Sequence, residues 1–237
     1  IRAATMSAHQ MPLQDVMQIV AHLRESGAAV LDWTLVHSRA QTCLISRKPD
    51  VYKGQTERLT ADFSKTEGHY KIFETIERLQ PTRIFYFAGG GPFGAFKDKE
   101  WKDHQWALEV SLVFPARLIH YCLQKSTALS LNQMIFTGST VAEAKPDPFA
   151  ASYAMSKHGL LGLISSLQAE ATLDLRLFSP HYMDTSLLPK NAWPRQTDKH
   201  NFKLWDVKDV AEKFGAWAFE EKNPWHYRLP GMVEEKP

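Results

Sequence analysis

Tyr153 and Lys157 are the two residues of this sequence whose types and spacing most directly suggest chemistry. They stand four positions apart at the start of an apolar segment with helical spacing, so they lie on one helix face, about one turn apart. An ammonium beside a phenol favours the phenolate and lowers the phenol pKa from its usual ~10. The pair therefore predicts a group that donates and accepts protons near neutral pH. Alone, the five-residue pattern is weak, because many helix surfaces carry it by chance.

The elements that must position this pair alternate between strand and helix patterns along the chain. Short apolar runs predict strands, and segments with apolar stripes predict the helices between them. This alternation predicts one α/β domain over residues 1–237, a doubly wound, Rossmann-type parallel sheet with helices on both faces. The expected strands are Thr42–Ser46, Glu57–Ala61, Arg83–Phe87, Gln133–Thr137, Leu173–Phe178 and one within Trp225–Met232, and the expected helices are Glu67–Leu79, Trp106–Gln124, Tyr153–Ala171 and Val207–Phe219.

The beginning of the chain allows two assignments. Residues 1–27 carry a helical apolar stripe that starts near Pro12 and ends at Gly27. In one assignment this helix follows a first strand at residues 1–5, and Ala28–Val36 forms the second strand. In the other it is an N-terminal helical extension, Ala28–Leu31 is the first strand, and Thr42–Ser46 is the second. The second assignment leaves the step from Leu31 to Asp32 abrupt, and it predicts that a glycine-rich loop has been lost there.

Composition limits the classes of protein and partner. The chain has 237 residues, 44% of them hydrophobic, and a net charge of +2, which suits a packed core and gives no bulk attraction to nucleic acid or an anionic membrane. Cys43 and Cys122 have neither metal-site nor disulfide spacing, so we expect reduced thiols, no metal and a cytoplasmic protein. No run approaches the ~20 apolar residues of a membrane span, and the first residues lack a signal-peptide pattern. A small-molecule partner is therefore favoured over nucleic acid or a membrane.

Small and polar residues follow several of the expected strands, and their order resembles the short-chain dehydrogenase/reductase family. The resemblance covers roughly residues 42–219, and the spacing of several motifs carries it more than any single one. The matching residues are Ala88-Gly89 with Gly94 after four further residues, Gly138-Ser139-Thr140 before Tyr153, Ser179-Pro180 followed by Asp184-Thr185, and Asp62 at the end of a strand.

The resemblance implies hydride transfer between a nicotinamide cofactor and a carbonyl or alcohol substrate. Tyr153 would pass the proton, while Lys157 would bind the nicotinamide ribose and lower the pKa of Tyr153. Ser139 would hydrogen-bond the substrate oxygen where negative charge develops, and Thr140 is a close rival for that role. Ser111 stands where the family usually has an Asn that braces the lysine through water, and it offers only one donor.

The resemblance also implies a cofactor site at the carboxyl ends of the strands. An acidic residue after the second strand would suit the ribose of NAD, whereas Arg47 suits the 2′-phosphate of NADP. We therefore expect NADP, with NAD as the alternative. The expected cofactor-binding residues are Arg47, Asp62, Phe63, Ala88, Gly89, Gly90, Tyr153, Lys157, Pro180 and Thr185.

Three departures from the family pattern keep a second function open. The glycine-rich phosphate loop of the first βα turn is absent. His181 replaces the Gly that follows Pro180, and Tyr86-Phe87 replace two Asn. A catalytically weak or inactive dinucleotide-binding sensor or structural protein of the same fold is therefore the alternative. A nucleotide-sugar epimerase or dehydratase would use the same Tyr and Lys, but the short segment after Pro180 disfavours it.

Residues 181–204 form a polar, Pro-containing segment that is expected to cover the substrate as a lid. Family members commonly form dimers or tetramers, so we expect a homodimer or homotetramer in which Trp106, Leu112 and Phe114 pack against the partner. The expected substrate contacts are Thr140, Tyr182, Met183 and Trp193.

Overall fold

A parallel sheet forms the centre of the computed structural model, which describes residues 17–21, 29, 41–48, 57–143, 147–188, 190, 192–195 and 202–233. Within these residues the sheet has seven strands in the order β3-β2-β1-β4-β5-β6-β8, and every neighbouring pair is parallel. The strands are β1 (Met17–Ala21), β2 (Gln41–Ser46), β3 (Glu57–Thr60), β4 (Arg83–Tyr86), β5 (Gln133–Thr137), β6 (Asp174–Ser179) and β8 (His226–Arg228).

Each central strand sends alternate side chains to opposite faces of the sheet, because successive side chains of a strand point in opposite directions. Ile84 and Tyr86 of β4 join one apolar cluster, while Phe85 between them joins the other. In β2, Cys43 belongs to the first cluster and Leu44 to the second. Both faces are therefore buried, which explains why these strands are continuous apolar runs rather than alternating ones.

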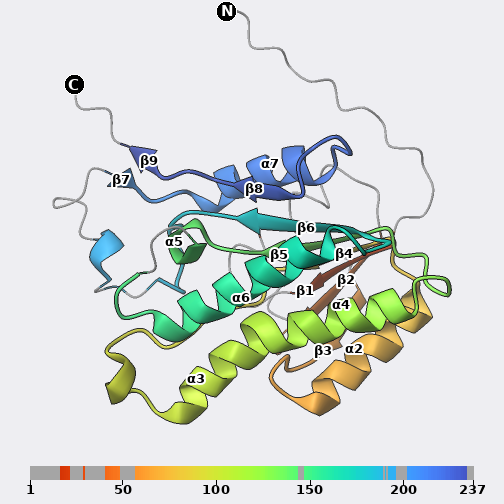
Figure 1. Ribbon diagram of the computed structural model, residues 1–237, viewed down its shortest axis with the longest axis horizontal. Coiled ribbons are helices and arrows are strands. Elements are labelled where there is room, and N and C mark those ends of the chain that lie inside the picture. Colours follow the sequence, from red (N-terminus) through yellow and green to blue (C-terminus); the bar gives the residue numbers. More distant parts are fainter. Residues whose placement is uncertain are drawn as a thin grey trace, which may run out of the picture.

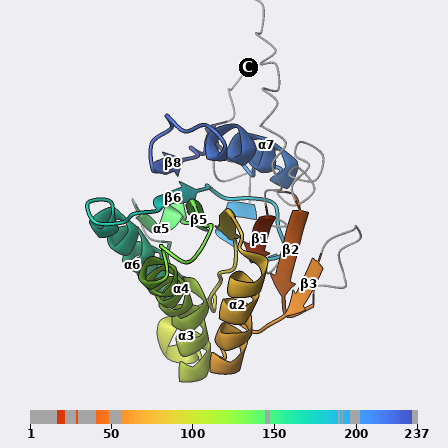
Figure 2. The same ribbon diagram turned by 90° about the vertical axis from the view of Figure 1, so that its right-hand side faces the viewer.

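Helices cover both faces of the sheet (Figures 1 and 2). The first apolar cluster includes residues of α2 (Thr66–Leu79), α4 (Phe114–Gln124) and α6 (Ala151–Leu167). The second cluster lies on the other face and is built on α7 (Val207–Ala218), with the helical residue Ala29 packed against it. The predicted doubly wound, Rossmann-type α/β fold is thereby confirmed.

The long helix that runs from residue 101 to residue 124 contains a π-helical turn. It consists of α3 (Trp101–Leu108), the π turn η3 (Glu109–Val113) and α4. The Phe114 amide donates to the Glu109 carbonyl, five residues back. Pro115 has no amide hydrogen to offer the next carbonyl, that of Val110, so the widened turn coincides with a missing backbone donor. Residue 111 lies in the middle of this turn.

The remaining elements are short. A one-turn helix, α5 (Thr140–Glu143), follows β5 directly, and η2 (Phe96–Asp98) and η4 (Trp193–Arg195) are single 3₁₀ turns. Strands β7 (Phe202–Lys203) and β9 (Met232–Val233) form a separate antiparallel ribbon. Among the described residues, none of the helices has the length and apolar character needed to cross a membrane.

The first strand lies at Met17–Ala21, inside the segment that the sequence predicts as a helix. Among the described residues it is the strand between β2 and β4, so the helix predicted over this segment is wrong there. Residues 1–5, the first strand of one assignment, lie outside the described residues, and Ala29, inside the first strand of the other assignment, is helical. The strand predicted at Thr42–Ser46 is confirmed as β2. A short apolar run fits a buried strand as well as a helix, and here pairing with the neighbouring strands selects the strand. The first strand–helix connection therefore falls between Ala21 and Ala29, where the sequence has one glycine, Gly27.

This strand order removes the reason to expect a loop lost between Leu31 and Asp32. Ala29 is helical rather than part of a first strand, and Leu31 and Asp32 themselves lie outside the described residues. What distinguishes this connection is its composition, which is poor in glycine.

Candidate active site

Helix α6 brings Tyr153 and Lys157 together on one face, as their spacing predicts. The Lys157 ammonium lies 5.7 Å from the centroid of the Tyr153 ring. Lys157 is 2% exposed, and its Nζ donates a 2.6 Å hydrogen bond to the carbonyl oxygen of Thr137 at the end of β5. The lysine is thus fixed between the helix and the carboxyl end of the sheet.

Ser139 completes the group from the loop that follows β5. It is 4% exposed, and its side chain hydrogen-bonds the Tyr153 phenol. The neighbouring Thr140 instead bonds the Pro180 carbonyl, through its amide at 3.1 Å and its hydroxyl at 3.4 Å. Of the two rivals from the sequence, Ser139 is therefore the one that contacts Tyr153.

The glycines after β4 allow this loop to approach α6 closely. A Cβ at Gly89 would lie 3.0 Å from Lys157 Nζ, and one at Gly91 would lie 3.2 Å from the Cβ of Tyr153. Both distances are tighter than ordinary van der Waals contact, so each glycine makes room for one residue of the pair.

Ser111 braces the same loop from the π turn. It is fully buried, its Oγ accepts a 3.1 Å hydrogen bond from the Gly90 amide, and it donates at 3.3 Å to the Gly90 carbonyl. The position of a Cβ at Gly89 would be 3.4 Å from Ser111 Oγ as well as 3.0 Å from Lys157 Nζ. The Ser111 hydroxyl is thus bonded to the backbone of the loop that approaches the lysine, and its predicted role of bracing Lys157 stays a prediction.

Burial controls the protonation of the pair. Burial raises the pKa of Tyr153, and the charges of Asp147 and Glu143 add to this effect, while the hydrogen bond with Ser139 lowers it only in part. Burial lowers the pKa of Lys157 to about 8, against a smaller rise from Glu143. The expectation that Lys157 brings the Tyr153 pKa below its usual value is therefore wrong in this structure, because desolvation of the phenolate is the larger effect.

Arg47 and Asp62 lie together at the ends of β2 and β3. Burial would raise the pKa of Asp62, but hydrogen bonds from Ser64 and the charge of Arg47 hold it below its usual value. Arg47 is exposed, with its Cζ 6.0 Å from the centroid of the Trp106 ring. Phe63, by contrast, is 1% exposed and packs in the first apolar cluster, so its predicted cofactor contact does not extend to the side chain.

Two predicted site residues that follow β6, Tyr182 and Thr185, are buried and hydrogen-bonded. Tyr182 is buried and its hydroxyl donates to Asp147, whose charge acts on Tyr153. Thr185 is buried, and its carbonyl accepts from Arg195 at 2.7 Å.

Met183 and Trp193 are the other two predicted substrate contacts that follow β6. Met183 is partly buried and packs against the second apolar cluster, so its substrate contact stays a prediction. Trp193 begins η4, and its side chain lies outside the described residues.

Sequence reasoning missed Glu143 and Asp147, two carboxylates that act on Tyr153. Glu143 lies on α5, four positions after Ser139, and its side chain is 2% exposed. Its partners come from β6 and β8, far along the chain, so no local spacing could have indicated them. The only local signal was an acidic residue at the end of the short segment that follows β5.

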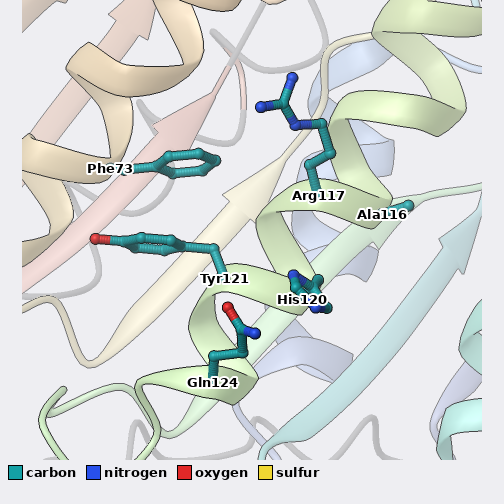
Figure 3. A pocket seen from close by; sticks show the side chains of 6 residues that line it. All are labelled: Phe73, Ala116, Arg117, His120, Tyr121 and Gln124. Atoms are coloured by element: carbon teal, nitrogen blue, oxygen red, sulfur yellow. The ribbon is translucent and has the colours of Figure 1, made fainter.

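A surface hollow of about 350 Å³ lies between α2 and α4, apart from the candidate catalytic residues. Figure 3 shows the stacked rings of Phe73 and Tyr121, whose centroids are 4.2 Å apart, beside residues of α4. None of Ser139, Tyr153 or Lys157 lines it. The residues that line this hollow are Phe73, Ala116, Arg117, His120, Tyr121 and Gln124.

The predicted partner-facing residues differ in their burial. Phe114 is fully buried inside the first cluster and cannot face a second subunit, so that part of the expectation is wrong. Trp106 and Leu112 are partly buried against the same cluster. A homodimer or homotetramer stays a prediction.

The residues that converge here fit a nicotinamide dinucleotide. An exposed cation and a partly exposed carboxylate follow β2 and β3, a glycine backbone comes within close reach of a buried ammonium after β4, and a serine and a tyrosine follow β5. Dinucleotides bind at this edge of an open α/β sheet, where the strand order reverses. The glycine-poor connection after β1 is the part of the sequence that matches such a site least.

No protein-family model and no curated protein matches the sequence. Solved structures match it over most of its length. A 4-hydroxyisoleucine dehydrogenase complexed with NADH is 17% identical, with a TM-score of 0.80 and coverage of 92% of this chain and 98% of that one. An alcohol dehydrogenase from the archaeon Thermococcus sibiricus, complexed with 5-hydroxy-NADP, is 18% identical, with a TM-score of 0.76 and coverage of 94% and 99%.

A third match is a short-chain dehydrogenase family protein from Francisella tularensis subsp. tularensis SCHU S4. It is 16% identical, with a TM-score of 0.75, and the match covers 88% of this chain and 93% of that one. At these identities the likeness establishes the fold, which is that of short-chain dehydrogenases/reductases, and leaves the activity to be argued from the site.

Proposed function

We propose that this chain is an oxidoreductase of the short-chain dehydrogenase/reductase type that transfers a hydride between NADP(H) and a carbonyl or alcohol substrate. The observation that carries the proposal is the convergence of Ser139, Tyr153 and Lys157 at the carboxyl ends of β4 and β5. A hydrogen-bonded serine and tyrosine beside a buried ammonium form an acid–base centre with a preformed donor next to it. A protein that only binds a dinucleotide has no need of all three.

In the reducing direction, Tyr153 donates its phenolic proton to the carbonyl oxygen of the substrate. Ser139 donates a hydrogen bond to the same oxygen, where negative charge develops. Lys157 stabilises the phenolate that remains, because its ammonium lies over the ring. A bound nicotinamide would supply the hydride, or accept it in the opposite direction. The raised pKa of Tyr153 keeps the phenol protonated and ready to donate, which favours reduction near neutral pH.

We further propose NADP rather than NAD as the cofactor. Lys157 would hold the nicotinamide ribose, and Asp62 would hold the adenine. Arg47 is exposed and follows β2, where a guanidinium suits the 2′-phosphate. The substrate would be a small molecule in contact with Tyr182. The lid predicted over residues 181–204 lies partly outside the described residues.

Binding and turnover should be tested in sequence. NADPH is first titrated against the protein, and NADPH oxidation is then screened over aldehydes, ketones, quinones and pterins. Tyr153→Phe should reduce the turnover found by about 10²- to 10⁴-fold, the usual contribution of a positioned acid. Tyr121→Phe is the matched control, since its hydroxyl bonds Glu77 on the surface. Unchanged turnover in Tyr153→Phe would refute the mechanism.

The composition of the connection after β1 favours a second candidate, a dinucleotide-binding sensor with little or no catalysis. Between Ala21 and Ala29 only Gly27 allows the close backbone approach that phosphate loops use. The same experiment separates the two candidates. NADPH binding without turnover of any screened class, and unaffected by Tyr153→Phe, would support the sensor.

A further inference from the structure

Glu143 is a buried carboxylate beside the proposed catalytic group. Its side chain is 2% exposed, and its partners come from two strands. Ser179, the last residue of β6, donates a short hydrogen bond to Oε1. His226 Nε2 lies 3.3 Å from Oε2, and Arg228 Nε donates to Oε2 at 3.1 Å. A carboxylate with this many partners from distant strands is held in one orientation.

The chain connects Glu143 directly to Ser139. The amides of Ala142 and Glu143 both donate to the Ser139 carbonyl at 3.1 Å, which closes the single turn of α5. On the other side of Ser139, a Cβ at Gly138 would lie 2.8 Å from Glu143 Oε1 and 2.2 Å from Ser179 Oγ. The Glu143 carboxylate therefore packs against the backbone on which Ser139 is carried.

The charge of Glu143 also reaches the other two residues. It raises the pKa of Tyr153, after burial and Asp147, and it raises the pKa of Lys157 against the stronger effect of burial. The position that the carboxylate occupies is held by hydrogen bonds, so this charge is a fixed part of the site rather than a mobile surface group. Its own pKa lies below the usual value, because bonds from His226, Ser179 and Arg228 outweigh the cost of burial.

We propose that Glu143 is a positioning residue for the catalytic group: its carboxylate fixes the Ser139 turn to β6 and β8 and sets the charge balance around Tyr153 and Lys157. This inference rests on the proposed function, since it concerns the same site. Arg228 is the counterpart of Glu143, a cation whose side chain is 62% exposed and which offsets the buried charge from the solvent side.

Four further ionisable groups lie around Glu143, Tyr153 and Lys157. Asp147 lies on the loop before α6 and adds negative charge at Tyr153, and Tyr182 after β6 bonds Asp147. His226 and Arg228 reach from β8. Because the phenol and the ammonium interact, their two apparent pKa values belong to the pair. A negative charge nearby raises both values, and a positive charge lowers both.

These charges determine the direction in which each substitution shifts the two pKa values. Glu143→Gln keeps the size of the side chain and removes its negative charge, so both pKa values of the pair should fall. Arg228→Gln removes a positive charge at the same carboxylate, so both should rise. In alcohol oxidation the rate increases as Tyr153 ionises, and the midpoint of the profile of kcat/KM against pH should report these shifts.

The experiment compares these profiles in wild type, Glu143→Gln and Arg228→Gln. The midpoint should move down by roughly one pH unit in Glu143→Gln, as for a nearby charge that is partly compensated. It should move up by less in Arg228→Gln, because solvent screens that side chain. Glu77→Gln is the matched control, since Glu77 lies on α2 and bonds Lys125 and Tyr121 on the surface. Its profile should match wild type.

A second measurement needs no turnover. Tyrosinate absorbance is titrated with pH in each protein and again after Tyr153→Phe, and the difference isolates Tyr153. Opposite shifts in the two variants by either method support the role of Glu143. Shifts of the same sign, or no shift while Tyr153→Phe still abolishes turnover, overturn it and leave the proposed function standing. Turnover that survives Tyr153→Phe would count against the proposed function instead.

Discussion

The Tyr86 hydroxyl donates a 2.6 Å hydrogen bond to the carbonyl oxygen of Val110 in the π turn. This carbonyl is the one left without a backbone donor because Pro115 has no amide hydrogen. Tyr86 stands where short-chain dehydrogenases/reductases usually have an Asn, and its side chain is almost completely buried. The tyrosine thus supplies the donor that the helix lacks, at the turn that carries Ser111.

Tyr86→Phe should therefore destabilise the protein. The substitution preserves the ring but leaves the Val110 carbonyl buried without this donor, which costs about 1–3 kcal/mol of unfolding free energy. Denaturant unfolding measures the loss. Tyr121→Phe is the control, because its bond to Glu77 is exposed and should be worth less than about 1 kcal/mol. Equal losses in the two variants would contradict this account.

Gly89→Ala should lower activity while the fold survives. A Cβ at this position would lie 3.0 Å from Lys157 Nζ, so the ammonium must move by a few tenths of an ångström, which disturbs its bond to the Thr137 carbonyl. We expect about a 10²-fold loss of kcat, typical of a small misplacement in an active site. In Gly162→Ala the added methyl meets nothing within 4 Å, and the variant should keep its activity and gain about 0.5–1 kcal/mol of stability. Unaltered kcat in Gly89→Ala would show that the lysine does not need its present position.

Lys157 should give the protein a characteristic dependence of stability on pH. Its pKa in the folded state is about 8, below the ordinary value of 10.5, so between these values the unfolded chain binds the extra proton. Its contribution to the unfolding free energy should therefore rise with pH across that window and be smallest below pH 8.

The test of this contribution compares wild type with Lys157→Met. Subtracting the two curves removes the other titrating groups, including buried tyrosines whose raised pKa values act in the opposite direction at higher pH. The difference should grow in favour of wild type as pH rises from about 8. A difference that is flat with pH would mean that Lys157 titrates normally in the folded protein.

Arg47 should decide the preference between the two dinucleotides. If its guanidinium holds the 2′-phosphate, Arg47→Ala should weaken NADPH binding by about 10- to 100-fold, the value of a hydrogen bond to a charged group, and leave NADH binding nearly unchanged. Lys48→Ala is the neighbouring control, since Lys48 is also exposed and follows the same strand. NADPH binding that is no tighter than NADH binding in wild type, and unchanged in Arg47→Ala, would remove the argument for NADP.

The sheet and the placement of Tyr153 and Lys157 on one helix face were largely predictable because their signals are local. Buried parallel strands such as Gln133–Thr137 are short apolar runs, and the prediction for that strand is confirmed in its bounds. The spacing of Tyr153 and Lys157 on one helix face is a property of any α-helix. The first strand was misread because five residues within an apolar segment fit either period, and only pairing with β2 and β4 selects the strand.

What failed depended on side-chain direction and on distant partners. Phe63 follows a strand that ends at the site, yet its side chain is buried in the first apolar cluster. The raised pKa of Tyr153 results from burial by many residues, which no pentapeptide encodes. The hydrogen-bond partners of Glu143 belong to strands that lie 36 or more positions further along the chain.

Strand β8 has a consequence for how the protein matures during synthesis. Arg228 and Glu143 are 85 positions apart, and β8 joins the sheet beside β6. The turn that carries Ser139 therefore leaves the ribosome well before the strand that fixes its carboxylate. Contacts between such distant positions form late, because a long loop must close before they contribute. A nascent chain that ends before β8 would hold the sheet up to β6, with Glu143 bonded to Ser179 but without His226 and Arg228. The order of translation therefore leaves the surroundings of the proposed catalytic group incomplete until β8 has docked.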